Sequence, residues 1–454
     1  MQKIPFSVDN TLMKRQAIQA LTEWKDHKTR KPLILRGARQ VGKTHLLKEF
    51  GHSEFPEMVY VNFEEDEGLS RIFKRDLKPG RIINELQLYL DCSIDIHQDL
   101  LIFDEIQRCP RALTSLKYFC EESPELALCA AGSLLGVCLN EASFPVGKVT
   151  YLDLAPMTFD EFVEALGKTR LLDQLNTPLK DAALPELAHE QLWDLWKHYL
   201  VVGGLPEAVK TYCEYHDNLR HAFQQVRQIQ GDLIDTYLVD IAKHCGKMNA
   251  LHVERLWRAV PAQLARSQDG SARKFVFKDA VPGIRGYERL SGLLGWLEQA
   301  NLLIRTSIID TPSLPLAAYA RENIFKLYFF DVGLLGAISG MSPALLLDYE
   351  FGSYKGYVAE NFVAQAIDAA GIRRHYCWQG RTSEVEFLLS TDQGIIPIEV
   401  KSGTVTQSKS LKVYEQKYDP SYSCVISGKN IDKHGKRLLF PLYMAGRIPT
   451  LLNA

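Results

Sequence analysis

The sequence lacks paired cysteine motifs. Its nine cysteines lie singly between Cys92 and Cys424, and no two of them form a CxxC pair. A disulfide scaffold and a zinc ribbon both need paired cysteines, so an odd number of scattered ones argues against either structure. Free thiols in a reducing compartment fit this usage better.

Signals for export and for membrane insertion are also lacking. The first ten residues, MQKIPFSVDN, contain no apolar segment of the kind that forms a signal peptide. The most apolar stretch, Leu126 to Leu139, is too short to cross a bilayer and contains Gly and Ser. We therefore expect a cytoplasmic protein without membrane contact.

The chain has no excess of charge of either sign. Lys and Arg together number 53 and Asp and Glu 55, which leaves a net charge of −2. This balance provides no general attraction to nucleic acid, so a nucleic-acid site must be a local patch. The 454 residues are 46% hydrophobic and 24% charged, which is ordinary for a globular protein of roughly three domains.

Short apolar runs alternate with helical patterns in the first third of the chain. The runs at Leu33 to Arg36, Met58 to Phe63, Leu100 to Phe103 and the segment ending at Gly132 predict four strands. Strands that alternate with helices are typical of a doubly wound parallel sheet in an α/β fold. From about Phe159 to residue 250, helical periodicity dominates.

The rest of the chain predicts two further parts. Helical runs followed by a strand at residues 301–309 indicate a winged-helix-like segment. Between Leu251 and Asp310 there are nine Lys and Arg residues and six Asp and Glu residues, a mild excess of positive charge. Strand-like segments after a helix at 355–371 indicate a small α/β domain. The expected division is an α/β core at 1–155, a helical lid or connector at 156–250, the winged-helix-like segment at 251–320 and the last domain at 321–454.

A phosphate-binding loop matches the G-x-x-x-x-G-K-[ST] pattern, between a predicted strand and a predicted helix. Backbone N–H groups at a helix N-terminus bind phosphate oxygens, a lysine bridges the outer phosphates, and a Ser or Thr hydroxyl ligates Mg²⁺. The candidate ATP-binding residues are Gly37, Ala38, Arg39, Gln40, Val41, Gly42, Lys43, Thr44 and His45.

Two acidic residues follow the third predicted strand. Asp104 and Glu105 come directly after the apolar run Leu100 to Phe103, at the strand end where ligands bind in such sheets. We expect Asp104 to hold Mg²⁺ together with Thr44, and Glu105 to activate the attacking water as the catalytic base, with Lys43 as the catalytic cation. An ordinary helix-capping pair is the alternative.

Further groups near the phosphates are less specific. Ser133 follows the fourth predicted strand, where it can reach the γ-phosphate or act only as a helix N-cap. Transition-state charge calls for another cation, for which Arg39, Arg108 and Lys148 are candidates by position. The arginine can also come from a neighbouring subunit.

A group of acidic residues lies near the C-terminus. Glu384 and Glu386 share one face of a predicted strand, and Glu399 and Lys401 share one face of the next. With Glu360 from the preceding helix, Glu386, Glu399 and Lys401 can hold Mg²⁺ or Mn²⁺ for phosphodiester cleavage, the logic of PD-(D/E)xK nucleases. The alternative is a solvated strand face. Glu386 stands where Asp is usual, which puts efficient cleavage in question.

Six motifs together resemble bacterial and archaeal AAA-type ATP-binding proteins that carry a C-terminal domain of unknown function. The motifs are GARQVGKT (Gly37 to Thr44), DEIQ (Asp104 to Gln107), PMTFDEF (Pro156 to Phe162), GGLP (Gly203 to Pro206), ENFV (Glu360 to Val363) and IEVKSG (Ile398 to Gly403). The resemblance spans nearly the whole chain. It implies an ATP-binding P-loop core, a winged-helix-like middle and a nuclease-like C-terminal fold.

The sequence therefore predicts an ATP-binding and ATP-hydrolysing switch protein with a DNA-facing C-terminal module and ATP and Mg²⁺ as cofactors. One alternative is a metal-dependent DNA nuclease gated by ATP. The other is an ATP-dependent module that binds a protein partner and makes no contact with DNA. A homo-oligomer is left open.

Overall fold

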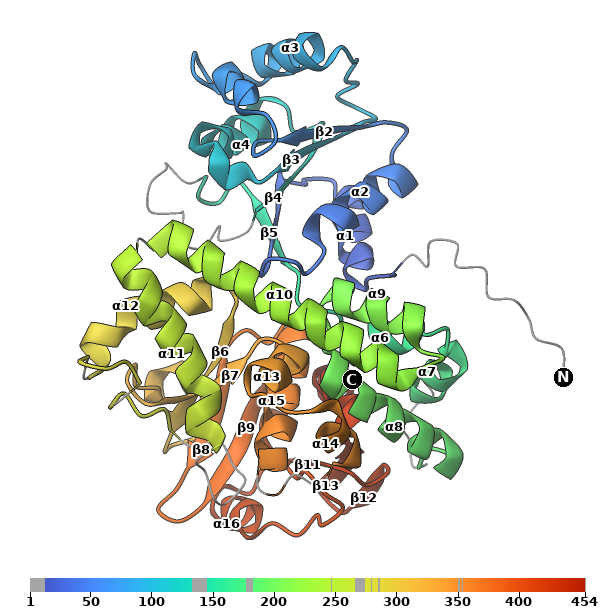
Figure 1. Cartoon of the computed structure of the whole chain (residues 1–454), viewed down its shortest axis with the longest axis vertical. Coiled ribbons are helices and arrows are strands. Elements are labelled where there is room, and N and C mark those ends of the chain that lie inside the picture. The colour runs from blue at the N-terminus through green and yellow to red at the C-terminus, as the bar shows by residue number, and fades with distance from the viewer. Residues whose placement is uncertain are drawn as a thin grey trace, which may run out of the picture. The chain divides into compact units, whose positions relative to one another are not determined.

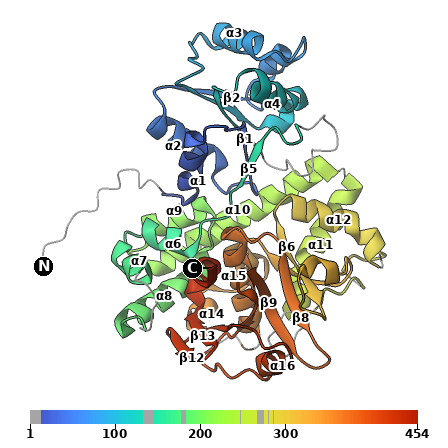
Figure 2. The ribbon, with the colours of Figure 1, turned by 180° about the vertical axis from the view of Figure 1, so that it is seen from behind.

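The chain folds into two compact units (Figures 1 and 2). The computed structural model describes residues 13–132, 145–176, 183–245, 247–265, 274–278, 280–284, 286–349, 352 and 354–453. The first unit spans Lys14–Ala155 and takes in the short segment Gln299–Asn301, and the second comprises the chain from Pro156 onward apart from that segment. The helical segment and both later parts expected from the sequence lie in the second unit.

The first unit is built on a parallel five-stranded sheet in the order β2-β3-β4-β1-β5. The strands are β1 (Leu33–Arg36), β2 (Met58–Asn62), β3 (Leu100–Asp104), β4 (Ala127–Ala131) and β5 (Thr150–Asp153). The expected α/β fold and parallel sheet are confirmed. β5 was not predicted, because its four residues are exposed or half-buried and show no apolar run.

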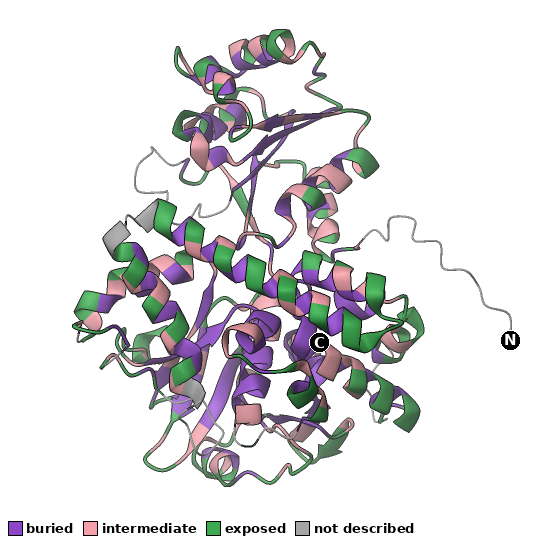
Figure 3. Ribbon diagram, in the orientation of Figure 1, coloured by how far each residue is buried: buried purple, intermediate pink, exposed green. Residues whose placement is uncertain are grey.

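Helices cover this sheet and complete its core. They are α1 (Ala17–Asp26), α2 (Lys43–Glu54), α3 (Pro79–Leu90) and α4 (Pro110–Glu122), with 3₁₀ turns at Glu67–Phe73 and Ile106–Arg108. The apolar face of α2 buries Leu46, Leu47 and Phe50. In Figure 3 the central strands β1, β3 and β4 are almost wholly buried, in keeping with helices on both faces of the sheet, whereas the edge strands β2 and β5 are partly exposed.

The second unit begins with helices. They are α6 (Phe159–Ala165), α7 (Thr169–Asn176), α8 (Glu186–Val202), α9 (Pro206–Tyr215), α10 (Leu219–Cys245), α11 (Lys247–Ala265) and α12 (Tyr287–Gln299). The start of α6 is fixed by a capping box in which Thr158 and Glu161 each accept a hydrogen bond from the other's backbone N–H. None of the described helices combines the length and the apolar character that a bilayer-spanning segment needs.

An eight-stranded mixed sheet forms the rest of this unit, in the order β12-β13-β11-β10-β9-β8-β6-β7. Its strands are β6 (Leu303–Ile309), β7 (Phe325–Phe329), β8 (His375–Gln379), β9 (Glu384–Thr391), β10 (Gly394–Val400), β11 (Ser423–Ser427), β12 (Asp432–His434) and β13 (Arg437–Pro441). The helices α13 (Val332–Ile338), α14 (Pro343–Asp348), α15 (Tyr354–Ala369), α16 (Lys409–Tyr418) and α17 (Ile448–Asn453) accompany them, with 3₁₀ turns at Leu316–Tyr319 and Leu442–Arg447.

The strand expected in a separate winged-helix-like segment belongs to this larger sheet. β6 pairs in parallel with β8, so that Ile309 lies opposite Trp378, and it pairs antiparallel with β7. Periodicity shows that a segment is a strand but carries no information on its partner. The long crossover between β6 and β8 could therefore not be read from the chain.

Two motifs of the sequence meet in one buried group of polar contacts. Met157 donates its N–H to the Gly204 carbonyl at 2.6 Å, and its own carbonyl accepts the hydroxyl of Tyr199 at 2.5 Å. Gly204 donates its N–H to the carboxylate of Asp331 at 2.7 Å. A Cβ on Gly204 would lie 2.1 Å from the Met157 carbonyl oxygen, so only glycine fits. PMTFDEF and GGLP therefore have a structural role here.

The ENFV motif contributes to the same group. The side chain of Asn361 accepts from the N–H of Phe329 at 2.7 Å and donates to its carbonyl at 3.0 Å. One turn further along α15, Gln365 bonds Tyr199 and the N–H of Val332. These bonds tie α15 to the end of β7 and fix the direction of the neighbouring Glu360.

Candidate functional site

The phosphate-binding loop between β1 and α2 has the backbone that its glycines predict. Gly42 has φ 93° and precedes the first residue of α2, while Gly37 has φ 154°. A Cβ on Gly37 would lie 2.3 Å from the carbonyl oxygen of Leu154. Gly37 is therefore required by the close approach of the chain after β5, a reason the sequence did not reveal.

The side chains of the loop divide into buried and exposed ones. Ala38 and Val41 are buried in the core, so only their backbone groups are available to a phosphate. Gln40, at φ 64°, and His45 are exposed, and His45 Nε2 lies 4.0 Å from the Glu49 carboxylate. Arg39 is half-buried in the loop.

Lys43 lies at the centre of the loop. Its ammonium donates to the carbonyls of Gly37 at 3.0 Å and Ala38 at 2.7 Å, and the residue is only 7% exposed. The positive charge is thus held beside the helix N-terminus, where the two potentials add. Such a loop is suited to bind a polyphosphate.

A hydrogen bond joins the start of α2 to the end of β3. The hydroxyl of Thr44 donates to Asp104 Oδ2 at 2.6 Å, and the N–H of Glu105 donates to Asp104 Oδ1 at 2.9 Å. Hard oxygen ligands of this kind are those that Mg²⁺ prefers. The residues present therefore fit Mg²⁺ bound with a nucleotide, and their metal role stays a prediction.

Glu105 is held beside Asp104 in an unusual backbone conformation. Its φ of 49° is left-handed, which turns its side chain away from the line of β3. The amide of Gln107 donates to its carboxylate. Burial raises the pKa of Glu105 above its ordinary value, although the bond from Gln107 opposes this shift. The carboxyl group is therefore a better proton acceptor than a solvated glutamate.

Two residues of this site were missed by sequence reasoning. Tyr60, on the neighbouring strand β2, donates its hydroxyl to Asp104 Oδ2 at 2.7 Å. Burial, and then the bond to Asp104, raise the pKa of Tyr60 well above its ordinary value, so the phenol stays protonated. The alternation of Tyr60 and Asn62 with apolar residues in β2 was the available signal. Arg15 had none, because its contacts are distant in sequence.

Arg15 braces the loop from the chain segment before α1. This buried guanidinium donates to the carbonyl of Val41 at 2.7 Å and to that of Ala155 at 2.6 Å. One side chain thereby joins the loop to the end of the first unit.

The remaining expected groups do not converge on this site: Lys148 precedes β5, whose first residue Thr150 lies opposite the first residue of β1, so it stands at the amino edge of the sheet, away from the loop. Arg108 forms an ion pair with Glu64, and Lys148 forms one with Glu121 at 3.0 Å. Ser133 lies outside the described residues. Lys148, predicted as a candidate from its position in the sequence, therefore does not fit the role of the completing cation, which stays unassigned between Arg39 and Arg108.

The structure brings together the acidic residues predicted near the C-terminus. β9 and β10 pair antiparallel with Phe387 opposite Ile398, and the same register continued sets Glu386 opposite Glu399. The carboxylate of Glu386 accepts from the N–H of Val400 at 3.0 Å, and Lys401 Nζ lies 2.6 Å from Glu399 Oε1. Burial, followed by the charges of Glu399 and Glu360, raises the pKa of Glu386 far above its ordinary value.

Glu360 joins this cluster from α15, as the sequence predicted. Its carboxylate accepts the hydroxyl of Tyr328 at 2.9 Å. Across the described part of the chain, however, no group of three or more His, Cys, Asp or Glu side chains is arranged to hold a metal ion. The metal role of Glu360, Glu386, Glu399 and Lys401 stays a prediction.

A lysine that sequence reasoning missed completes the cluster. Lys326, on β7, has no exposed side-chain surface, and its ammonium forms ion pairs with Glu360, at 3.6 Å, and with Glu384. Burial alone would lower the pKa of Lys326, but Glu360 and Glu384 outweigh it, so the ammonium stays charged. A single Lys inside the apolar run FKLYFF was the signal that a buried partner was needed.

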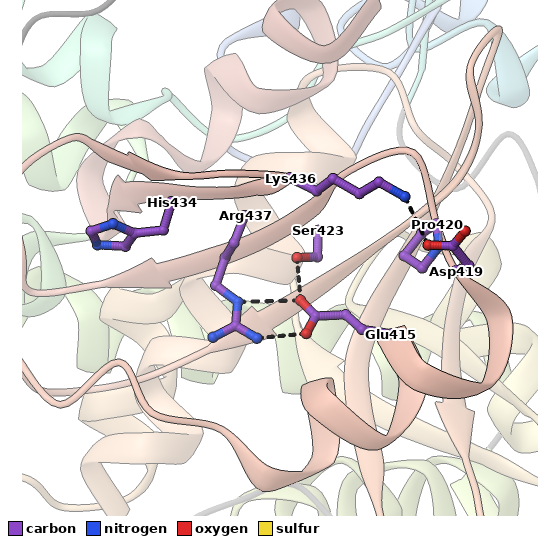
Figure 4. Close-up of a pocket in the computed structure, with 7 residues that line it drawn as sticks. All are labelled: Glu415, Asp419, Pro420, Ser423, His434, Lys436 and Arg437. Atoms are coloured by element: carbon purple, nitrogen blue, oxygen red, sulfur yellow. Dashed lines mark hydrogen bonds and ion pairs between the residues drawn. The ribbon is translucent and has the colours of Figure 1, made fainter.

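A separate cavity of about 290 Å³ opens beside α16 and β13 (Figure 4). Its charged groups are already paired with one another: Arg437 forms a double ion pair with Glu415, and Lys436 lies 2.7 Å from Asp419. Since these cations are neutralised within the cavity wall, the cavity offers little charge to a ligand.

Comparison with known proteins agrees with this arrangement. Residues 29–163 match the AAA domain family, 194–345 match a domain of unknown function, DUF8612, and 355–444 match another, DUF4143. The loop and the β3 carboxylates both lie within the first match. In its fold and its loop the first unit is similar to an AAA-type P-loop domain, and the matches to the two domains of unknown function follow it along the chain.

Solved structures match the chain only at low similarity. A Walker-type ATPase of Pyrococcus abyssi is 17% identical with a TM-score of 0.46, over 72% of this chain and 96% of that one. The Orc1 protein of Aeropyrum pernix in complex with DNA is 12% identical with a TM-score of 0.31, over 72% and 91%. We draw no functional conclusion from matches at this level. No curated protein matches the chain.

Proposed function

We propose that this protein binds ATP in the loop Gly37 to Thr44 and hydrolyses it. The observation that carries the proposal is the hydrogen bond of 2.6 Å between Thr44 and Asp104. It joins the loop to the acidic end of β3, so that a hydroxyl, a carboxylate and the Lys43 ammonium stand at one edge of the sheet. Ligands bind at this edge in such folds.

The chain's own groups divide the work of binding. The loop N–H groups and Lys43 would bind the phosphate oxygens, and Thr44 and Asp104 would hold Mg²⁺. When bound, Mg²⁺ neutralises phosphate charge that the protein alone would leave uncompensated. Tyr60 orients Asp104 through the hydrogen bond of 2.7 Å.

Glu105 is the proposed base. Its left-handed backbone and the hydrogen bond from Gln107 hold the Glu105 carboxylate next to Asp104. The Thr44 hydroxyl donates to Asp104, which leaves the Glu105 carboxylate for the attacking water. It would accept a proton from the attacking water as that water approaches the γ-phosphate. The second cation of the transition state would come from Arg39 or Arg108, or from another subunit.

The test is the ATP affinity and turnover of Lys43→Ala beside the wild type. Removal of the ammonium should abolish turnover and weaken ATP binding severely, because this is the charge that the loop holds at its centre. Lys74→Ala, which changes an exposed lysine of the same unit, should leave both unchanged. Unchanged ATP binding in Lys43→Ala would overturn the proposal.

For the second unit, called the C-terminal unit from here on, we propose that it faces DNA and that ATP switches its binding. The convergence of Glu386, Glu399 and Lys401, a set that phosphodiester-cleaving domains also use, supports this choice. Its test is DNA affinity as a function of salt, with and without ATP. If this unit binds DNA, its log affinity should fall with log salt concentration. The slope of that line should become shallower in Arg289→Ala, which changes an exposed position on α12. Arg285, a second basic candidate, lies outside the described residues.

A metal-dependent nuclease is the second candidate, because the same cluster favours it. It predicts cleavage of plasmid or single-stranded DNA with Mg²⁺ or Mn²⁺ that disappears in Lys401→Ala. A protein-binding module without DNA contact predicts neither cleavage nor a salt-dependent affinity for DNA. The same two assays therefore separate all three functions.

A further inference from the structure

Lys326 lies within the acidic cluster of the C-terminal unit although its own strand is at the edge of the sheet. β6 and β8 stand between β7 and β9, so the ion pair between Lys326 and Glu384 reaches across two strands. Lys326 is paired in register with Thr306, and alternation puts Cys377 on the same face. His375 is the residue in register with Thr306 on β8, but Thr306 and Cys377 are both small and leave room for the long lysine side chain.

The charges of the cluster require a cation inside it. Four carboxylates, of Glu360, Glu384, Glu386 and Glu399, lie close to Lys326 and Lys401. Lys401 is 32% exposed and pairs with Glu399 at the rim, whereas Lys326 has no exposed surface. Buried carboxylates without a counter-charge are strongly destabilising. Lys326 is the counter-charge in the interior.

A second observation points into the same space. Glu399 is 2% exposed, and its Oε2 atom is buried without a hydrogen-bond partner among the described residues. Its other oxygen is bonded to Lys401. The cluster therefore keeps one unused carboxylate oxygen in its interior, the kind of atom that a cation would bind.

We propose that the ammonium group of Lys326 is the resident cation of this cluster, in the place that a divalent metal ion would take between Glu360 and the β9 carboxylates. The wild-type C-terminal unit then binds no Mg²⁺ or Mn²⁺ there and is stable without either. Loss of Lys326 uncovers a divalent-cation site made of Glu360, Glu384, Glu386 and Glu399. This inference deepens the proposed role of the C-terminal unit as a module that binds without cutting.

Direct measurement of Mn²⁺ binding tests this. Nucleotide-free full-length protein is titrated with Mn²⁺ as wild type, Lys326→Met, Lys326→Arg and the double variant Lys326→Met with Glu399→Gln. Lys326→Met should bind one more equivalent of Mn²⁺ than the wild type, and the double variant should lose it. Lys326→Arg keeps the charge and should match the wild type. Any Mn²⁺ held at the ATP site is common to all four proteins.

Two results would overturn the inference: no additional Mn²⁺ in Lys326→Met, or Mn²⁺ binding by the wild type that is lost in a fifth protein, the single variant Glu399→Gln. If Lys326→Met does not fold, Mn²⁺ present during refolding should restore it, and failure to do so counts equally against the proposal. ATP binding, measured on the same samples, should stay at the wild-type level. The titration of DNA affinity against salt thus reports failure of the proposed DNA-facing role, and the Mn²⁺ titration reports failure of this inference.

Discussion

The ATP-binding candidate and the C-terminal acidic cluster are both carboxylates beside a lysine, but the two sites treat the charges oppositely. At the first, Asp104 accepts from neutral hydroxyls, those of Thr44 and Tyr60, while Lys43 is held by backbone carbonyls. At the second, Lys326 forms ion pairs directly with Glu360 and Glu384. A lysine bonded to backbone carbonyls can exchange these bonds for a charged ligand, whereas a buried lysine in direct ion pairs cannot do so without leaving its carboxylates uncompensated.

A third buried carboxylate shows another solution. Asp331 accepts from the N–H groups of Gly204 and Leu334, and no lysine takes part. These backbone donors satisfy its hydrogen-bonding capacity but supply only partial charge. The three carboxylates thus differ in their partners. Asp104 accepts from hydroxyls and can still bind a ligand, Glu360 is paired with a lysine, and Asp331 holds the fold together through backbone N–H groups.

The largest effect is expected from removal of the buried lysine. Lys326→Met should lower the free energy of unfolding in metal-free buffer by about 3–5 kcal/mol, because the carboxylates lose their interior counter-charge. Denaturant unfolding measures this. Lys436→Met breaks the exposed pair with Asp419 and should change the stability little. Equal effects of the two substitutions would contradict the assignment of Lys326 as the counter-charge.

Asp331 should make stability depend on pH. Burial raises its pKa from 3.8 to about 6, against the opposing effect of the backbone bonds from Gly204 and Leu334 and the charge of Arg227. The folded state therefore keeps a proton that the unfolded state has released. The stabilisation is complete below about pH 4 and is lost as the pH rises through 6, by about 3 kcal/mol in total.

Unfolding free energies at pH 4 and pH 7 measure that dependence. Asp331→Asn cannot titrate, so the loss of stability from pH 4 to pH 7 should be smaller by that amount, while the exposed control Asp392→Asn should keep the wild-type dependence. A wild-type pH dependence that persists in Asp331→Asn would assign it to another group.

Glu105→Gln should separate binding from hydrolysis. The amide keeps the shape of the side chain but cannot accept a proton, so we expect ATP binding to persist and turnover to fall about 10²-fold, equivalent to about 2.7 kcal/mol. The exposed substitution Glu57→Gln is the control. Because burial raises the pKa of Glu105, wild-type turnover should begin to fall, on acidification, at a higher pH than that of a solvated glutamate.

Gln107→Ala sharpens this test. The hydrogen bond from the Gln107 side chain lowers the pKa of the Glu105 carboxyl group. Loss of this hydrogen bond should therefore move the acid limb of the profile of turnover against pH to still higher pH. If the acid limb of the pH profile does not move in Gln107→Ala, the pKa of a group other than Glu105 determines its position.

Tyr60→Phe should have the smallest effect. Loss of one hydroxyl bond to Asp104 costs about 1 kcal/mol, or roughly fivefold. If Tyr60 orients Asp104 for Mg²⁺, the loss should show in the Mg²⁺ concentration needed for half-maximal turnover, and ATP binding measured without Mg²⁺ should be unchanged. Tyr89→Phe removes a comparable bond to Asp66 on the exposed surface and serves as the control.

The local features of the first unit followed from the sequence. The spacing of Gly37, Gly42, Lys43 and Thr44 between an apolar run and a helical pattern sufficed to predict the loop, because each contact involves residues close together in the chain. The position of Asp104 at the end of β3 followed from strand length and polarity. The alternation of Glu386 with Glu384, and of Glu399 with Lys401, likewise predicted shared faces.

Only the tertiary structure decided which distant groups meet. Tyr60 and Arg15 reach the loop through strand order and helix packing, Lys326 reaches Glu384 across two intervening strands, and β6 finds β8 after a long crossover. Periodicity determines the face on which a side chain lies but not the strand beside it. The sequence therefore determined the chemistry that each segment carries, and the pairing of segments decided whether that chemistry remains open to a ligand or is neutralised from within.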